Sequence, residues 1–372
     1  MELTWPQVLA WRMRRQFLLP DADSLVLDPS AVEIVRRLAG VQAQVMSAAE
    51  QAVAVRTRAR RPGALAQGLA DGELVRSWAM RGTLHVLPSD ELATYLAPLA
   101  AARTWEKASW QKAFLDADSM RALTDAAREL LGDGAVLTRE ELTDAVVAHA
   151  GDPGLAEHLR SGWGAVLKPL AWQGLLVQGR PRDGKVTFTS PASLPGWHGL
   201  PPVEEAGPAV VLAYLAAYGP AAAAALDDWL LRGATPKKVL RGWFADLAAR
   251  GVVVEVSVEG EPLWARAADV DELAAARPDT STRLLPAFDQ YVLGPGTKDP
   301  HVLDPRHRAE VSRTAGWIAP VVVHAGRVVG TWEAADGVVR VQLFPEAPPL
   351  DPADLAREAA ALNPGLPVEV IR

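Results

Sequence analysis

The 372-residue sequence contains no cysteine and few lysines. The absence of cysteine excludes disulfide bonds, iron–sulfur clusters, zinc–thiolate sites and thiol nucleophiles. Seven of the 38 basic residues are lysines, and none of these seven lies between residues 1 and 106. A lyase that forms a Schiff base through a lysine of that region is therefore not expected.

Long apolar runs are also missing. The longest ones, such as residues 209–217, are much shorter than the roughly 18 residues of a membrane-spanning helix. Residues 1–5 have neither the basic nor the apolar region of a secretory signal. Because 49% of the residues are hydrophobic and 22% are charged, we expect a soluble, cytoplasmic protein with no membrane partner.

The formal net charge of −7 does not exclude a nucleic-acid partner, because the charge is unevenly distributed. Residues 1–110 carry 13 basic and 11 acidic residues, whereas residues 333–372 carry three basic and seven acidic ones. This asymmetry allows a basic groove. A genome rich in G and C, which enriches arginine and alanine, explains the arginine excess equally well.

The middle of the chain shows the order helix, helix, hairpin that is typical of a winged helix-turn-helix. Thr138 and Glu141 form the pattern of a capping box, which predicts a helix over residues 139–150. A second helix is expected from about residue 155 or 160 to Gln173. Strand-like runs at residues 175–178 and 186–189 flank Asp183-Gly184, which is a strong hairpin signal.

The same order recurs on both sides of this segment. Downstream, we expect helices at residues 209–218 and 221–231, a third helix that opens at Thr235-Pro236, and a hairpin from strands at 252–258 and 263–267. Upstream, a less regular copy has helices at residues 5–17, 31–38, from 47 and 62–70, and ends in residues 81–87. The predicted fold class is α+β, with three tandem winged helix-turn-helix units at residues 1–100, 101–200 and 201–280.

Residues 281–372 follow a different pattern. Short strands are expected at 321–324, 327–332 and 338–343, separated by Ala325-Gly326 and Asp336-Gly337. These predict a C-terminal module that is a small β-barrel or β-sheet. Since the chain has no coiled-coil heptads, we expect a monomer.

General catalytic motifs are absent. The sequence has no GxGxxG after a strand, no P-loop, no HExxH and no GxSxG. The seven histidines show no metal-ligand spacing. We therefore expect no metal and no cofactor. The scatter of Trp5, Trp11, Trp78, Trp163 and Trp243 indicates core positions rather than base-stacking ones.

Two short stretches are unusual. In Gln42-Ala43-Gln44, residues i and i+2 share a face only if the backbone is extended, and both amides can then point at one spot. Taken from spacing alone, the favoured interpretation of the pair is an ordinary helix cap or a solvent contact. In residues 80–85, alternation along a strand would place Arg81, Thr83 and His85 on one side, facing other units or a ligand. A purely structural wing is the alternative.

These two stretches, together with residues 284–294 (LLPAFDQYVLG) and 326–332 (GRVVGTW), occur in an order and spacing that resemble the AlkZ-like winged-helix DNA glycosylases. The resemblance extends from Trp5 to about Phe344. It implies three winged helices and a C-terminal β module that form a concave DNA-binding face. It further implies removal of alkylated purines, notably bulky N7-alkylguanine adducts and crosslinks, in some members as self-resistance to DNA-alkylating natural products.

The catalytic Gln–apolar–Gln motif of the family maps onto Gln42 and Gln44. A sister branch has Asp at the second position, so Gln44 places the chain in the branch that includes the resistance enzymes. The resemblance therefore implies a monofunctional glycosylase in which Gln42 and Gln44 position a water molecule. The expected partner is double-stranded DNA that carries an alkylated purine.

Candidate DNA contacts are basic or polar side chains in or close to these motifs. The candidates are Arg58, Arg60, Arg61, Arg81, Thr83, His85, Lys298, Arg306, His307, Arg308 and Arg313. For the segment from 298 to 313, the alternative is a solvated loop whose charges pair with Asp299, Asp304 and Glu310.

Two other functions are compatible with the same units. A winged-helix transcriptional regulator that binds DNA without catalysis is one, and a structural partner that recruits repair factors is the other. Three different tandem units give an asymmetric surface, whereas a regulator usually binds a palindrome as a dimer. The glycosylase is therefore the favoured hypothesis.

Overall fold

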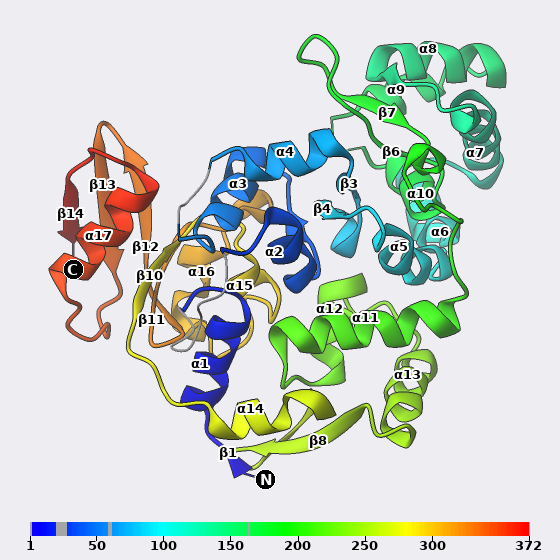
Figure 1. The fold of residues 1–372 in the computed structure, drawn as a ribbon. Helices are drawn as coiled ribbons and strands as arrows, with labels where there is room; N and C mark the ends of the chain where they lie inside the picture. Colours follow the sequence, from blue (N-terminus) through cyan, green and yellow to red (C-terminus); the bar gives the residue numbers. More distant parts are fainter. Residues whose placement is uncertain (1, 20–27, 59–61, 163, 372) are drawn as a thin grey trace.

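The computed structural model describes residues 2–19, 28–58, 62–162 and 164–371. In these ranges, α-helices surround three sheets of three, six and five strands, which confirms the mixed α+β class. Figure 1 shows the C-terminal strands and helix α17 on one side of the molecule and helices α7, α8 and α9 at the opposite upper corner. Within the described residues, no helix has the length and apolar character needed to cross a membrane.

The first segment carries a short edge strand and a hairpin among five helices. Its helices α2, α3 and α4 pack around a compact core that includes Ile34, Val53 and Leu65. The elements are α1 (Trp5–Arg15), α2 (Ala31–Arg37), β2 (Val41–Gln42), α3 (Met46–Ala54), α4 (Ala64–Asp71), β3 (Leu74–Trp78), the 3₁₀ turn η1 (Met80–Gly82), β4 (Leu84–Pro88) and α5 (Leu92–Ala101).

The second segment follows the local signals of the sequence closely. Helix α8 begins after Thr138, whose side chain accepts from the Glu141 amide, so the predicted capping box is confirmed. Asp183 and Gly184 both have positive φ, as a tight hairpin turn requires. The elements are α6 (Ala108–Ala113), α7 (Ala117–Gly132), β5 (Leu137–Thr138), α8 (Arg139–Ala150), α9 (Leu155–Arg160), α10 (Leu167–Trp172), β6 (Val177–Gln178) and β7 (Thr187–Thr189).

One prediction for this segment was wrong. The single helix expected up to Gln173 is two helices, α9 and α10, with a break between them. Gly164 lies in the break with φ +59°, and a Cβ there would come within 2.5 Å of the Trp78 ring. The packing of Trp78 against this turn therefore requires glycine, which interrupts the helix.

The first two segments share one sheet, with strand order β2-β4-β3-β6-β7-β5. The connection is the antiparallel pair Arg76 and Gln178, which joins β3 to β6. Strand β2 lies at one edge of this sheet, paired only with β4. Because β2 carries Gln42, the edge position leaves the other side of that strand available for contacts outside the sheet.

The third segment also binds the N-terminus of the chain. Strand β1 (Glu2–Leu3) pairs with β8 in parallel, and Trp5, Val8 and Trp11 of α1 pack with the β8–β9 hairpin. The third helix starts after Pro236, one residue later than predicted. The elements are α11 (Val203–Tyr218), α12 (Ala223–Leu231), α13 (Lys237–Ala249), β8 (Val253–Val258), β9 (Glu261–Arg266) and α14 (Val270–Ala275).

The C-terminal segment has a five-stranded sheet with order β10-β11-β12-β13-β14. The predicted strands 321–324 and 338–343 are confirmed without change of bounds, and the middle strand extends to Ala335. The elements are β10 (Thr282–Leu285), α15 (Gln290–Leu293), α16 (Arg308–Val311), β11 (Val321–His324), β12 (Arg327–Ala335), β13 (Val338–Leu343), α17 (Pro352–Leu362) and β14 (Val368–Ile371).

Tryptophans are mostly core residues, as predicted. Trp5, Trp11, Trp78 and Trp243 are buried. Trp163 lies outside the described residues. The division of the chain into four units stays a prediction. The expected boundary between the first two units is crossed by the pairing of β3 with β6, so these two units share one sheet.

Candidate active site at the Gln42 strand

Gln42 lies in an extended edge strand that follows a sharp turn. Gly40 has φ +100°, and the chain passes from it directly into β2, where Gln42 pairs with His85 of β4. The Ala43 amide donates to the Leu84 carbonyl at 2.7 Å, so the strand pairing continues one residue beyond Gln42. Gln42 therefore has the extended backbone that would allow the side chains of residues 42 and 44 to share one face.

Gln44 follows in a bend just before α3, and its side chain is exposed. Gln42, by contrast, is 6% exposed. The two amides thus differ in their surroundings, one held in the sheet and the other open to solvent. Their convergence on one water molecule stays a prediction.

The prediction of a strand across residues 80–85 is wrong for the first half of that range. Met80–Gly82 is a tight turn, in which Arg81 has φ +57° and Gly82 has φ +71°. The turn is closed by the Ala79 amide, which donates to the Thr83 carbonyl at 3.0 Å, and by the Thr83 hydroxyl, which donates to the Met80 carbonyl at 3.2 Å. Arg81, Thr83 and His85 therefore do not line one face of a strand, because the β3–β4 connection needs left-handed residues at its tip.

The turn directs Arg81 toward Gln42. The Arg81 Nη2 atom donates to Gln42 Oε1 at 3.2 Å. Its Nη1 atom donates to the carbonyls of Trp229 in α12 and Leu293 in α15, both at 3.4 Å. Burial lowers the Arg81 pKa to about 10, so the side chain is still protonated at neutral pH. Arg81 thus faces two other segments of the chain, as the sequence had predicted, and joins them to Gln42.

His85 lies behind Gln42 in the sheet and is fully buried. Its Nδ1 atom lies 3.0 Å from the Thr83 carbonyl, so Nδ1–H is the donor of the neutral ring. Burial, together with a smaller effect of the Arg81 charge, lowers the His85 pKa to about 3. This burial argues against the predicted DNA contact of His85, and the ring instead supports the strand that carries Gln42.

Two cations that sequence reasoning missed lie beside the Arg81 turn. Lys168 of α10 packs close to Gly82, where an added Cβ would come within 3.5 Å of Lys168 Cδ. Arg232, just after α12, is exposed, and its charge lowers the pKa of both Arg81 and Lys168, where burial is the larger cause. Among the described residues, no carboxylate forms an ion pair with any of the three. We call Arg81, Lys168 and Arg232 the η1 cluster.

A second arginine-rich region is partly neutralised by carboxylates. A cavity of about 950 Å³ is lined by nine arginines, Arg58 among them, but not by Gln42 or Gln44. Several of these arginines are paired, for example Arg36 with Asp90 and Arg283 with Glu358. The Arg58 amide donates to Asp28 at 2.7 Å, and Arg60 and Arg61 lie outside the described residues.

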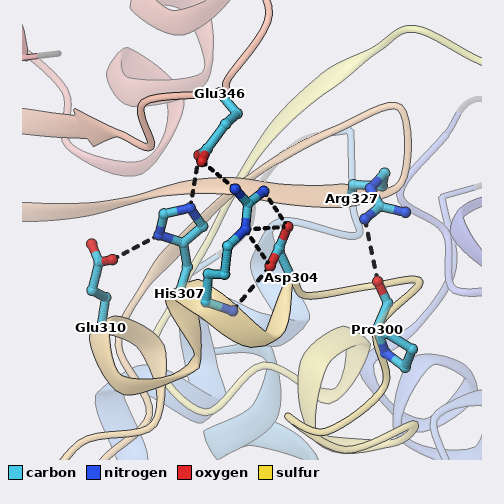
Figure 2. Close-up of polar contacts among 7 residues, drawn as sticks. Pro300, Asp304, His307, Glu310, Arg327 and Glu346 are labelled. Atoms are coloured by element: carbon cyan, nitrogen blue, oxygen red, sulfur yellow. Dashed lines mark hydrogen bonds and ion pairs between the residues drawn. The ribbon is translucent and has the colours of Figure 1, made fainter.

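The basic residues after the 284–294 motif form a cluster of another kind (Figure 2). His307 contacts Glu310 at 2.8 Å and Glu346 at 2.9 Å and stacks on Phe344. Arg306 pairs with Asp304 at 2.7 Å and with Glu346 at 2.6 Å. Burial disfavours the charged His307 ring, but the two glutamates outweigh it and raise the His307 pKa. The alternative of paired charges thus describes Arg306 and His307, with Glu346 as an additional partner.

The other predicted contacts of this segment remain accessible. The side chains of Lys298, Arg308 and Arg313 are exposed. Arg308 donates to the Thr297 hydroxyl at 3.3 Å, and Arg313 donates to the Glu310 carbonyl at 3.1 Å. Since neither bond neutralises a positive charge, their DNA contacts stay a prediction.

Comparison with known proteins gives concordant results. A profile of the family described as "DNA glycosylase AlkZ-like" matches residues 35–364. The "Interstrand DNA cross-link repair glycosylase" of Streptomyces sahachiroi is 47% identical over 364 residues, which is 97% of this chain and 96% of that protein. The solved structure of "Streptomyces sahachiroi DNA glycosylase AlkZ" superposes with a TM-score of 0.93 at 46% identity and covers both chains completely.

Proposed function

This chain belongs to the AlkZ-like family of DNA glycosylases, and we propose that it hydrolyses the N-glycosidic bond of purines with bulky alkyl groups at N7, including guanines joined in a crosslink. The similar Streptomyces protein is named for repair of interstrand crosslinks, and this chain matches it over nearly its whole length. The structural observation that supports the proposal is the Gln42 amide, fixed in an edge strand beside a cation cluster that has no carboxylate partner in the described part of the chain.

The chemistry suits two amides. A purine alkylated at N7 carries a positive charge and is already a good leaving group, so it needs little acid catalysis. The remaining task is to hold water against C1′ as positive charge develops on the sugar. Glutamine side chains donate and accept hydrogen bonds but do not titrate, so Gln42 and Gln44 position the water and do not act as a base.

The η1 cluster supplies a site for the DNA backbone. Arg81, Lys168 and Arg232 bring three positive charges together without an acidic partner among the described residues. A phosphodiester placed there would receive charge-assisted hydrogen bonds and would release counterions. Exposed Lys298, Arg308 and Arg313 extend this contact over the C-terminal segment.

We propose a monofunctional reaction, which leaves an abasic site and no covalent enzyme–DNA intermediate. Lys168 is the lysine that tests this point, because burial lowers its pKa and favours the neutral amine. Borohydride added during turnover should trap no protein–DNA adduct. An adduct that disappears in Lys168→Gln would assign a lyase step to this residue.

The decisive experiment is single-turnover release of base from duplex DNA that carries a defined N7-alkylguanine. We expect Gln42→Ala combined with Gln44→Ala to lower the rate by at least about 100-fold, the usual effect of lost transition-state hydrogen bonds. DNA binding should be nearly unchanged. Equal loss of binding and rate would show that the two residues hold the fold or the DNA.

The alternative function is a transcriptional regulator that binds DNA without catalysis. The relatives are named as glycosylases, so a regulator is not favoured. Absence of release from several classes of lesion, together with sequence-selective binding to undamaged DNA, would nevertheless establish it. Sedimentation would test the expected monomer.

A further inference from the structure

The hydrogen bond between Arg81 and Gln42 has a chemical direction. A guanidinium group has only donors, whereas a glutamine amide has one acceptor oxygen and one donor nitrogen. Arg81 therefore holds Gln42 through Oε1, at 3.2 Å from Nη2, and the opposite orientation would place donor against donor. The orientation of the Gln42 amide is thus imposed by its neighbour.

Arg81 is itself anchored independently of Gln42. Its Nη1 atom bonds the carbonyls of Trp229 and Leu293, which belong to two other segments. Its backbone is left-handed, a conformation that is unfavourable for a non-glycine residue and is often found at functional sites. The turn and the two carbonyls therefore hold the guanidinium in place without help from Gln42.

The free end of Gln42 is its nitrogen. Gln42 is 6% exposed. No described residue forms a hydrogen bond with its Nε2 atom, and this atom is not fully buried. Nε2 consequently reaches the protein surface. Gln44, in contrast, is exposed in the following bend.

We infer that Arg81 is a positioning residue that makes Gln42 a hydrogen-bond donor and leaves the acceptor role to Gln44. This inference rests on the proposed glycosylase function and divides the work of the two amides. Gln42 Nε2–H donates to the oxygen of the attacking water, and Gln44 Oε1 accepts one of its O–H groups. The remaining lone pair of the water then faces C1′.

The step balances without a further reactant. The water oxygen forms a bond to C1′, and the C1′–N9 bond breaks with its electron pair going to the purine. The cationic N7-alkylpurine thereby leaves as a neutral base. The sugar gains a hydroxyl group, and the proton lost by the water passes to solvent.

Matched carboxylate substitutions test the division. Gln42→Glu has only acceptors and forms an ion pair with Arg81, so base release should fall by about 100-fold, as for loss of one oriented donor. Gln44→Glu keeps an acceptor oxygen, and its rate should stay within about tenfold of the unmodified chain, the worth of one ordinary hydrogen bond. Equal loss in both variants, or a greater loss at Gln44, would overturn the inference.

A double-mutant cycle tests whether Arg81 acts through Gln42. If it does, Arg81→Met should lower the single-turnover rate at saturating protein, and Arg81→Met with Gln42→Ala should be no slower than Gln42→Ala alone. Arg76 provides a matched control, because it is also partly buried and donates to the Ala43 carbonyl rather than to an amide side chain. Arg76→Met and Gln42→Ala should be additive.

The outcomes separate this inference from the proposed function. Additive effects of Arg81→Met and Gln42→Ala would overturn the inference while leaving the glycosylase intact. Absence of base release by the unmodified chain would overturn both together. If Arg81→Met does not fold, Arg81→Lys and the two carboxylate variants still decide the question.

Discussion

Arg56 and Asp289 form a buried two-point ion pair, in which Nη1–Oδ2 and Nη2–Oδ1 are both 2.7 Å. Both side chains are inaccessible to solvent, and Arg56 also donates to the Ala52 carbonyl at 2.6 Å. Asp289 in turn caps α15 through the Tyr291 amide. The pair therefore connects the end of α3 to the 284–294 motif, and through α15 to the carbonyl that anchors Arg81.

Removal of one member of this pair should be strongly destabilising. Asp289→Ala leaves a buried guanidinium without a counter-charge, and we expect a loss of about 3–5 kcal/mol in the free energy of unfolding. Urea unfolding measures this loss. The matched double variant Arg56→Met with Asp289→Leu should lose less, since no buried charge remains. A smaller loss for Asp289→Ala than for the double variant would contradict the argument.

The rate of base release should be independent of pH between about pH 6 and pH 9. Neither glutamine titrates, the His85 pKa of about 3 keeps that ring neutral, and the Arg81 pKa of about 10 keeps the guanidinium charged. Single-turnover rates at saturating protein across this range provide the measurement. An inflection near pH 6.5 would indicate a histidine that takes part in the chemistry.

The free energy of unfolding, unlike the rate, should depend on pH. His85 has a folded pKa of about 3 against 6.5 when unfolded, so the unfolded chain binds the proton first and acid favours unfolding. At pH 5.5 the contribution of His85 should be about 1.3 kcal/mol less favourable than at neutral pH. His85→Asn should lose less stability than the unmodified chain over the same interval. Parallel pH curves for the two proteins would show that His85 is not the cause.

The η1 cluster should be visible in the salt dependence of DNA binding. Lys168→Gln and Arg232→Gln should each reduce the slope of log K against log salt by about 0.9, if each residue neutralises one phosphate. Lys238 on α13 is exposed and serves as a control of equal charge change. An unchanged slope in both cluster variants would show that DNA does not contact this site.

The turn before the Gln42 strand should tolerate no side chain. A Cβ at Gly40 would lie 2.7 Å from Leu87 Cδ2, and its φ of +100° is unfavourable for other residues. Gly40→Ala should therefore cost about 1–3 kcal/mol of stability and also slow base release, because β2 must shift. Gly72 has a similar φ of +78° but no heavy atom of the described chain near a Cβ. Gly72→Ala should lose stability without a comparable loss of rate.

Much of the local structure followed from short stretches of residues. The Thr138 capping box, the Asp183-Gly184 turn and the strands at 321–324 and 338–343 were all predicted and are confirmed. The order of the motifs likewise indicated the family. Caps and tight turns depend on hydrogen bonds between near neighbours in the chain, so a short sequence window contains the information that specifies them.

The site depended on contacts between distant residues. The left-handed turn at Arg81, the pairing of β3 with β6, and the meeting of Arg81, Lys168 and Arg232 each join segments far apart in sequence. No local pattern distinguishes Lys168 from the other lysines, and the burial of His85 is decided by the sheet around it. Which side chains surround Gln42, and with what charge, is a property of packing between segments, where favourable contacts form only after the chain has folded.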